Sequence, residues 1–481
     1  MALTIRNSHP VRHNAAFGWA CRQYLDQQKR LTSSPGYSRL RGPDRRRRAF
    51  TTSIRSPASH RVLVVGGGPA GCTTAYFLAK AGLDVTVIER SVRSPYGQGL
   101  DITNQAVEVV KRMGLLDTIK ANMTGETGFA LLDDTGRRIG SLLGTNAAQY
   151  ESVENDELPS FTNEIEIMRG TLNEILADAA KQEGVKFRYG CTITNLRQYI
   201  DCVSATLSDN KQAEDYMAII GADGVGSLVA KLVFPEGMLK NSLDPTNTFA
   251  AYFSMDLDKV DQMSYSRLQH GGGGRAIWVR PIDRQGTRAS GYFITTTPTS
   301  TELEKLSASL TSGTQQQEKM AQLYADMGGI KDVVVQGMRK SDDWHFTRLV
   351  QVKLPTWHIG RCALVGDAAY CPTPLTGQGT SMALMGAYIL AGELAANPTN
   401  PGAAFAEYKR KFDPYVKEEG MIPLGGRAPN IFVPQSRLAV WALRQLYSGF
   451  SNGYGKGLFK FLNSGKKDED KFRLPMYKFK A

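Results

Sequence analysis

The stretch Arg61–Arg90, RVLVVGGGPAGCTTAYFLAKAGLDVTVIER, decides the fold predicted for this chain. It reads as a short apolar strand, a glycine-rich turn, a small apolar helix and a second strand that finishes at Glu89. The turn fits the pattern G-x-G-x-x-G, with Ala70 inside it, on Gly66, Gly68 and Gly71. A glycine-rich turn without a ligand would not require the acid at the end of the next strand, so the complete unit indicates a dinucleotide site.

Each residue type in this unit has a separate physical role. Gly66 permits the tight turn, Gly68 lets a pyrophosphate approach the helix N-terminus, and Gly71 lets helix and strand pack closely. Glu89, with Arg90 beside it, can accept hydrogen bonds from ribose hydroxyls.

Composition excludes several classes of protein. The 481 residues suffice for two or three domains, and no run of about 18 apolar residues predicts a membrane span. The six cysteines show no C-x-x-C spacing and the six histidines no H-E-x-x-H, so neither a disulfide framework nor a metal site is predicted.

The net charge of +12 is concentrated at the N-terminus. Residues 1–60 hold eleven Arg and one Lys against Asp26 and Asp44, which gives +10 and leaves only +2 for the rest of the chain. We therefore expect no nucleic-acid partner. The basic, acid-poor leader resembles a mitochondrial presequence that ends near Phe50. The alternatives are a disordered basic extension without a targeting role, or an upstream segment that does not belong to the protein; either would leave the protein cytoplasmic.

Two more acidic residues are expected at the carboxyl ends of buried strands. Asp223 follows the apolar run 217–220, and Asp367 follows Arg361–Val365. Ligands of open α/β sheets bind beyond such ends, although Asp before Gly is also an ordinary turn former. After Asp367, a loop leads through Gly377 and Gly379 into an apolar helix, whose N-terminus could stabilise a negative charge.

Arg169 opens a third predicted helix. An arginine at this position could form two hydrogen bonds with a diphosphate or with a ring edge, and the alternative is a charge exposed to solvent.

The composition of the chain changes after about residue 243. Residues 243–345 are rich in short β segments and predict a mostly antiparallel sheet that forms the wall of a substrate site.

Taken together, the ordered motifs Gly66–Gly71 with Glu89, Gly221–Gly224, and Gly366–Asp367 with 377–379 resemble the class A FAD-dependent monooxygenases. This is the family of para-hydroxybenzoate hydroxylase, and the stretches 89–101 and 371–394 are most similar to its tetracycline-inactivating and secondary-metabolite branch. The resemblance covers about residues 61–400. Two positions depart from the family pattern, where Tyr370 and Ala230 replace a frequent His and Arg.

The resemblance implies an α/β fold: a Rossmann-like FAD-binding domain with an inserted, mostly antiparallel β-sheet substrate domain and a C-terminal helical segment. The expected boundaries are a leader 1–60, FAD-binding segments 61–242 and 346–400, a substrate domain 243–345, and C-terminal helices with a basic tail 401–481. In the tail region, the helix expected at 437–447 could lie on a membrane surface; we favour packing on the FAD-binding domain followed by a solvated tail.

The resemblance also implies roles for residues of this sequence. Gly66, Gly68, Gly71 and Glu89 would hold the ADP half of FAD, Asp367 the ribityl–pyrophosphate region, and Gly377 and Gly379 would lie beside the isoalloxazine. Arg169 matches a flavin-contacting Arg, and the Asp223 motif serves both FAD and NAD(P)H.

The implied reaction uses NAD(P)H and O2 to insert one oxygen atom into an aromatic or polyketide-like small molecule. No catalytic acid or base is assigned. The alternatives are a reductase or dehydrogenase of the same fold, a non-catalytic flavoprotein, and a halogenase. A halogenase would carry W-x-W-x-I-P, and no two of the five Trp stand two residues apart.

Overall fold

The structure is a computed structural model that describes residues 60–92, 98–103, 105–143, 165–257, 264–297, 301–308, 313–422, 428–451 and 472–479. All of them belong to the unit Phe50–Ala481. The predicted leader therefore lies outside the described residues, except for His60.

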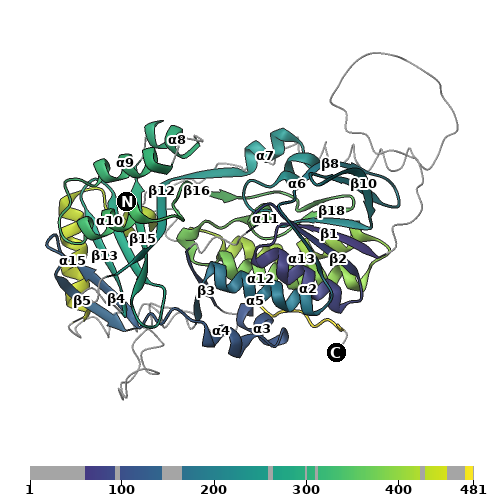
Figure 1. The fold of residues 1–481 in the computed structure, drawn as a ribbon, viewed down its shortest axis with the longest axis horizontal. Coiled ribbons are helices and arrows are strands. Elements are labelled where there is room, and N and C mark those ends of the chain that lie inside the picture. Colours follow the sequence, from purple (N-terminus) through teal and green to yellow (C-terminus); the bar gives the residue numbers. More distant parts are fainter. Residues whose placement is uncertain are drawn as a thin grey trace, which may run out of the picture. The chain divides into compact units, whose positions relative to one another are not determined.

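A six-stranded sheet carries the glycine-rich unit (Figure 1). Its order is β17-β18-β11-β1-β2-β7, and every neighbouring pair is parallel except β17 with β18. The strands are β1 (Arg61–Val65), β2 (Asp84–Glu89), β7 (Lys186–Tyr189), β11 (Ala218–Gly221), β17 (His358–Ile359) and β18 (Cys362–Leu364). Strand β18 comes from the returning part of the chain and lies directly beside β11, which confirms the Rossmann-like fold.

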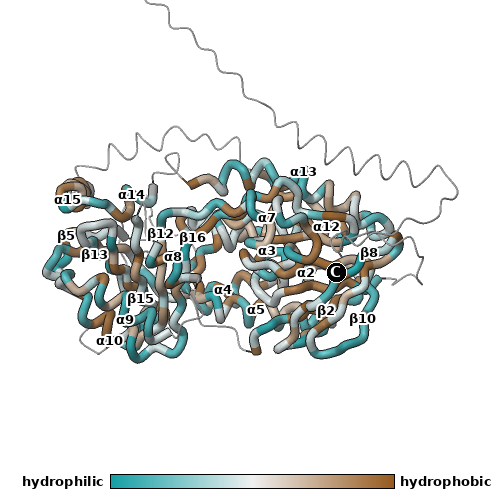
Figure 2. Tube along the Cα trace, turned by 90° about the horizontal axis from the view of Figure 1, so that it is seen from above, coloured by the Kyte–Doolittle hydropathy of each residue, from teal (hydrophilic) through white to brown (hydrophobic). Residues whose placement is uncertain are grey.

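Long helices pack with this sheet around one apolar core. Helix α2 (Pro69–Lys80) contacts both α5 (Arg169–Gln182) and α12 (Gly379–Ala396), and α13 (Pro401–Glu419) packs on α12. Every residue of α12 from Thr380 to Leu394 is buried, as expected for a helix that is apolar all round. Figure 2 shows the hydrophobic segments gathered around α2 and α12. The shorter helices are α3 (Gln105–Arg112), α4 (Leu116–Ala121), α6 (Leu228–Val233), α7 (Glu236–Ser242), α11 (Asp367–Tyr370) and η3 (Pro374–Thr376).

A seven-stranded sheet forms the second part, in the order β16-β12-β15-β14-β13-β4-β5. All its pairs are antiparallel except β13 with β4. Its strands are β4 (Gly128–Leu132), β5 (Arg138–Leu143), β12 (Leu243–Asp256), β13 (Tyr265–Gly271), β14 (Arg275–Pro281), β15 (Arg288–Thr296) and β16 (His345–Val352). The predicted range 243–345 was too narrow, because pairing between segments distant in sequence adds β4 and β5 and because β16 runs on to Val352.

The two faces of this sheet are covered differently. Helices α8 (Thr301–Ala308), α9 (Gly313–Leu323) and α10 (Lys331–Lys340) pack over Phe253, Ile277 and Phe293. Side chains alternate along a strand, so the neighbouring Tyr252, Trp278 and Tyr292 belong to the opposite face.

Helices α14 (Ala428–Phe432) and α15 (Arg437–Ser451) also pack on the seven-stranded sheet. Arg444 Nη2 lies 2.7 Å from Asp134 Oδ1, and the Tyr447 hydroxyl donates to the Phe129 carbonyl at 3.1 Å. The prediction that this helix packs on the FAD-binding domain was therefore wrong. Its hydrophobic period indicates a buried face but does not say which sheet covers it.

The described C-terminal segment, residues 472–479, packs on the FAD-binding domain, where α15 was expected to lie. Within residues 472–479, the apolar Phe472, Leu474, Tyr477 and Phe479 alternate with exposed residues and contact the core of the six-stranded sheet. The prediction of a solvated tail was wrong for this segment; residues 452–471 and 480–481 lie outside the described part.

Two small sheets complete the fold. One is β10-β9-β8, made of β8 (Ile193–Gln198), β9 (Val203–Leu207) and β10 (Asn210–Tyr216). The other pairs β3 (Gly99–Ile102) antiparallel with β6 (Ile165–Met168), immediately before Arg169.

Candidate functional site

Four predicted site residues follow strands that lie side by side. In the order β18-β11-β1-β2, the first three strands are followed within three residues by Asp367, Asp223 and Gly66, and Glu89 is the last residue of β2. Because these strands are parallel, their carboxyl ends meet at one edge of the sheet. The structure thus brings four residues from three distant parts of the sequence to the edge where open α/β sheets bind ligands.

The glycine turn has the geometry that its sequence predicts. Gly66 has φ 109°, and a Cβ there would stand 2.4 Å from the Ala222 carbonyl oxygen. A Cβ at Gly71 would stand 1.9 Å from the Gly66 carbonyl oxygen, whereas one at Gly68 would meet no atom within 4 Å. Gly66 and Gly71 are therefore required by packing, and Gly68 leaves open space beside the N-terminus of α2, which no side chain caps.

Glu89 organises the same turn from the adjacent strand. Its carboxylate accepts hydrogen bonds from the backbone N–H of Gly67 and of Ser91, both at 2.8 Å. An ionised carboxylate has about four acceptor positions, so capacity remains for a ribose hydroxyl. Arg90 stands just past the strand and is exposed.

Asp223 makes local contacts. It accepts hydrogen bonds from Ser227 Oγ at 2.5 Å and from the backbone N–H of Leu228 at 2.6 Å and Val229 at 3.3 Å. Burial raises the pKa of Asp223, and these hydrogen bonds oppose the rise. Its carboxylate therefore holds the turn that starts α6, which agrees with the turn-former alternative.

Asp367 is the first residue of α11 and follows a glycine with positive φ. Gly366 has φ 66° and ψ −144°, a conformation accessible to glycine. The Asp367 side chain is exposed, yet burial raises its pKa while Arg169 and Cys371 oppose the rise. Solvent therefore reaches this carboxylate at the edge of the sheet, while the protein atoms around it disfavour its charge.

The charge of Arg169, the first residue of α5, acts both on Asp367 and on the seven-stranded sheet. The Arg169 backbone N–H donates to the Gln98 carbonyl at 3.1 Å. Burial raises the pKa of Tyr252 to about 12, against the effect of Arg169, and the pKa of His345 is lowered by burial and then by Arg169.

The N-terminus of α12 supplies another ligand-facing element. No side chain caps the helix at Gln378, and Gly377 has φ 68° with open space where a Cβ would be. Gly379 is nearly as open, since its nearest neighbour, Pro372, would be 4.0 Å away. Thr103, just after β3, places its N–H 2.9 Å from Ser381 Oγ and thereby fixes this end of the helix.

Sequence reasoning missed a row of rings on the sheet face that carries Tyr252. His345, Tyr252, Tyr292 and Trp278, here called the aromatic row, are successive cross-strand neighbours on β16, β12, β15 and β14. Their ring centroids are 4.8, 6.2 and 5.6 Å apart in that order. The indole N–H of Trp278 is buried, and no described residue offers it a hydrogen-bond partner. The signal in the sequence was the alternation, but strand register was needed to align the rings.

Tyr370, where the family often has His, belongs to the core. Its hydroxyl lies 2.9 Å from that of Tyr408, and its ring packs 4.6 Å from Trp357. A Cβ at Gly386 would stand 1.9 Å from the Tyr370 hydroxyl. The glycine in α12 therefore makes room for the larger ring.

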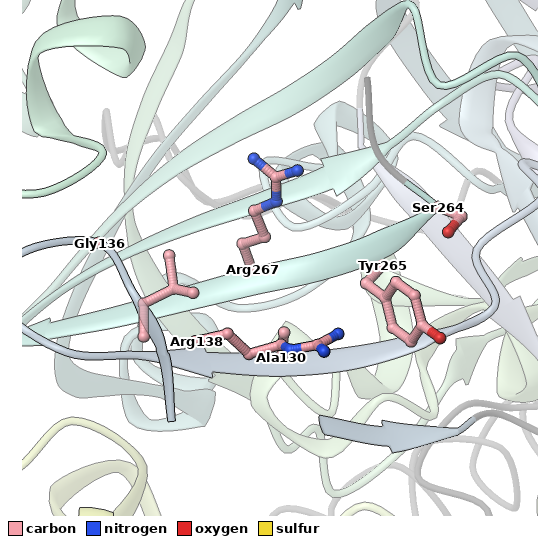
Figure 3. Close-up of a pocket in the computed structure, with 7 residues that line it drawn as sticks. Ala130, Gly136, Arg138, Ser264, Tyr265 and Arg267 are labelled. Carbon is pink, nitrogen blue, oxygen red and sulfur yellow. The ribbon is translucent and has the colours of Figure 1, made fainter. Parts of the chain in front are cut away.

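A separate open pocket of about 280 Å3 lies on β4, β5 and β13 (Figure 3). Its lining includes Arg138, Tyr265 and Arg267, and Arg138 lies 6.0 Å from the Tyr265 ring. None of the predicted cofactor residues lines it. We therefore assign the candidate site to the edge where β18, β11, β1 and β2 end, because the predicted residues converge there.

Other site types find little support in the described ranges. Those residues contain no group of three or more His, Cys, Asp or Glu side chains arranged to hold a metal. Five cysteines there are free and buried. No helix among the residues placed by the structure is long and apolar enough to span a membrane.

Comparison with known proteins identifies the family. A profile of the FAD binding domain family matches residues 59–417. The chain is 42% identical over 426 residues to monooxygenase CTB7 of Cercospora beticola, covering 88% of this chain and 98% of that protein. It is 31% identical over 408 residues to the FAD-dependent monooxygenase asL4 of Sarocladium schorii, covering 80% and 90%.

Solved structures share the fold. Tetracycline destructase Tet(55) has a TM-score of 0.68 and 26% identity, covering 88% of this chain and all of the other. Klebsiella pneumoniae HpxO, complexed with FAD and uric acid, has a TM-score of 0.63 over 82% and 96% of the two chains. At 17% identity, that likeness shows the fold alone.

Proposed function

Because this chain belongs to the class A FAD-dependent monooxygenases, we propose that it holds one FAD across the edge where β1, β2, β11 and β18 end. The open space at Gly68 admits the pyrophosphate to the N-terminus of α2, and Glu89 binds the ribose. Asp367 binds the ribityl–pyrophosphate region. Gly377 and Gly379 let the isoalloxazine approach α12.

FAD, once reduced by NAD(P)H, supplies the O2-activating chemistry that inserts one oxygen atom into the substrate. The protein contributes positioning and electrostatics. The uncapped N–H groups at the start of α12 stabilise negative charge on the ring system. Arg169, whose charge acts on Asp367 and on His345, orients groups between the cofactor edge and the aromatic row.

The observation that carries this proposal is the meeting of the open glycine turn at Gly68, Glu89 and Asp367 at the carboxyl edge of the parallel strands. The charge of Arg169 acts on two members of the aromatic row, Tyr252 and His345, and rings of this kind support an aromatic or polyketide-like substrate. Relatives named as fungal monooxygenases and a structural neighbour named as a tetracycline destructase support a role in secondary metabolism or detoxification.

The decisive experiment uses protein lacking residues 1–60 and its Gly68→Ala variant. We expect the wild-type chain to bind FAD and to consume NADPH or NADH and O2 in step with oxygenated product across a panel of phenols, quinones and polyketides. We expect G68A to fold normally, because no atom lies within 4 Å of the new Cβ, but to bind FAD more weakly.

Each other outcome points elsewhere. Oxidation of NAD(P)H without incorporation of oxygen would support a reductase or dehydrogenase. A product that forms only with halide would support a halogenase. No NAD(P)H oxidation with any compound would support a non-catalytic flavoprotein. A G68A variant with unchanged FAD affinity would contradict the proposed pyrophosphate site.

For localisation, the basic leader supports a mitochondrial presequence. Import of a reporter fused to residues 1–60 tests it. A reporter that stays cytosolic would leave the cytoplasmic alternative.

A further inference from the structure

One arginine of the seven-stranded sheet is surrounded by three carboxylates. Arg280 of β14 is buried, and its Nε donates to Glu126 Oε2 at 3.0 Å. Its Nη2 lies 2.6 Å from Glu166 Oε1 of β6 and 3.9 Å from Asp101 Oδ1 of β3. We call these four residues the Arg280 cluster; none of them is among the cofactor residues.

The charges of the Arg280 cluster do not balance if every carboxylate is ionised. Three carboxylates and one guanidinium then carry a net charge of −2, with Glu126 and Glu166 themselves buried. Asp101 and Glu166 are also direct cross-strand partners, and like charges in that arrangement repel. A buried charge without compensation is strongly destabilising, so the cluster favours retaining a proton.

The geometry identifies Glu166 as the carrier of that proton. Both of its carboxyl oxygens are buried, and Oε1 stands close to Arg280. The Glu126 carboxyl lies within hydrogen-bonding reach, so a proton on Glu166 has an acceptor there. Glu126 itself accepts a well-formed hydrogen bond from Arg280. Burial raises the pKa of Glu166 well above its usual value; Arg280 opposes the rise, and Glu126 and Asp101 add to it.

The strands that the Arg280 cluster joins lead directly to the proposed flavin contacts. Met168, opposite Gly99 in the β3–β6 pair, precedes Arg169. At the other end, Thr103 contacts Ser381 of α12. On the sheet side, the Arg280 guanidinium lies 4.8 Å from the Trp278 ring, and the Tyr292 hydroxyl accepts from the Gly99 N–H at 3.3 Å.

We propose that Arg280 is a positioning residue that fixes the aromatic row against the β3–β6 pair, and thereby against Arg169 and α12, with Glu166 held as a neutral carboxylic acid. The catalytic consequence rests on the proposed monooxygenase function. The protonation of Glu166 does not, so the two can be tested separately.

The proton is tested with Glu166→Gln in the FAD-bound protein, since glutamine has the shape of a protonated glutamate. We expect E166Q to keep the wild-type thermal midpoint and KM. The wild-type-minus-E166Q infrared difference spectrum should show the C=O band of a buried carboxylic acid. The control is Glu302→Gln, which removes an exposed carboxylate paired with Lys319 at 2.7 Å and should not change that band. A spectrum without the band would overturn the assignment of the proton to Glu166.

The positioning role is tested with Arg280→Lys, which keeps the positive charge but loses the planar guanidinium that can contact several carboxylates at once. We expect product formed per NAD(P)H to fall by about tenfold to a hundredfold, as a displacement of about 1 Å can cause, with KM little changed. A purely structural role would lower the folded fraction and leave product per NAD(P)H unchanged. The matched control is Arg339→Gln, which breaks an exposed pair with Glu318 at 3.1 Å in the helical layer.

If R280K forms as much product per NAD(P)H oxidised (the coupling) as the wild-type protein, the positioning role is refuted. If R280K does not fold, the test passes to Asp101→Asn, which removes a weaker partner at 3.9 Å and should lower the coupling in the same direction; unchanged coupling there would refute the role equally. If the wild-type protein itself oxygenates nothing, the proposed function fails, while the infrared band still decides the state of Glu166.

Discussion

Gly366 lies against Ala70 so closely that a Cβ on the glycine would stand 2.9 Å from the alanine Cβ. The contact joins the turn after β18 to the first turn of α2. Two motifs that are far apart in the sequence therefore form one surface beside the proposed pyrophosphate.

Gly366→Ala should disrupt this surface. Backbone strain at φ 66° alone is expected to cost about 1–3 kcal/mol, and the clash with Ala70 would displace α2 in addition. We expect a lower urea midpoint and weaker FAD binding by fluorescence titration. The control Gly184→Ala shares a positive φ of 87° but has open space, so it should destabilise without affecting FAD affinity. Equal FAD affinities of G366A and wild type would contradict the packing argument.

Arg169→Gln should change the titration of a residue on the other side of the site. Arg169 contributes to the lowered pKa of His345, after burial. Removing the guanidinium should move the His345 pKa upward toward its ordinary value, as measured by the NMR shifts of its ring protons. FAD affinity should fall in the same variant. If the His345 pKa stays unchanged, the two residues are not as close as the structure places them.

Phe479→Ala should destabilise the FAD-binding domain from the end of the chain. The Phe479 ring packs 4.9 Å from Phe77 of α2, and Tyr477 packs 5.3 Å from Tyr388 of α12. Because Phe479 is only partly buried, we expect a loss of about 1–3 kcal/mol, less than for a fully buried ring. The control is Met476→Ala, at a position that is 80% exposed, which should change the urea midpoint little. Equal midpoints for the two variants would refute the packing of this segment.

His270 should make the fold sensitive to acid. Its Nε2 donates to the Phe432 carbonyl at 2.7 Å, and burial lowers its pKa to about 4. The unfolded chain binds a proton below a pKa of about 6.5, so stability is complete above that pH and falls by up to about 3 kcal/mol as the pH drops toward 4.

His270→Gln keeps a donor for Phe432 but cannot titrate. We expect its stability to depend less on pH between about 4 and 6.5 than that of the wild-type chain. Some dependence should remain, because the pKa of His358 is also lowered to about 4 by burial. Identical slopes in the two proteins, measured from urea midpoints, would show that His270 is charged or solvated in the fold.

Local chemistry explains which predictions were correct. The strand, turn and helix around Gly66 follow from short-range sterics, since the Cβ that would clash at Gly71 meets an atom only five residues away. The same reasoning placed Arg169 at the first position of α5 and Asp367 after a buried strand. The family resemblance, carried by these motifs, supplied the fold class that the structure confirms.

Non-local pairing explains what was missed. The parallel match of Tyr265 with Gly128 adds β4 and β5 to the seven-stranded sheet, and no local pattern encodes it. The apolar alternation of residues 472–479 is visible in the sequence, but its partner, α12, is not.

The sequence by itself therefore determined the glycine turn, the acids that end the parallel strands, and the cofactor class that this combination serves. These features depend on residues close together along the chain. Only the tertiary structure decided the aromatic row, the sheet that α15 covers, and the meeting of Arg280 with Asp101, Glu126 and Glu166. Each of those requires strand register and contacts between distant segments, which are set by packing of the whole core and not by any one stretch of residues.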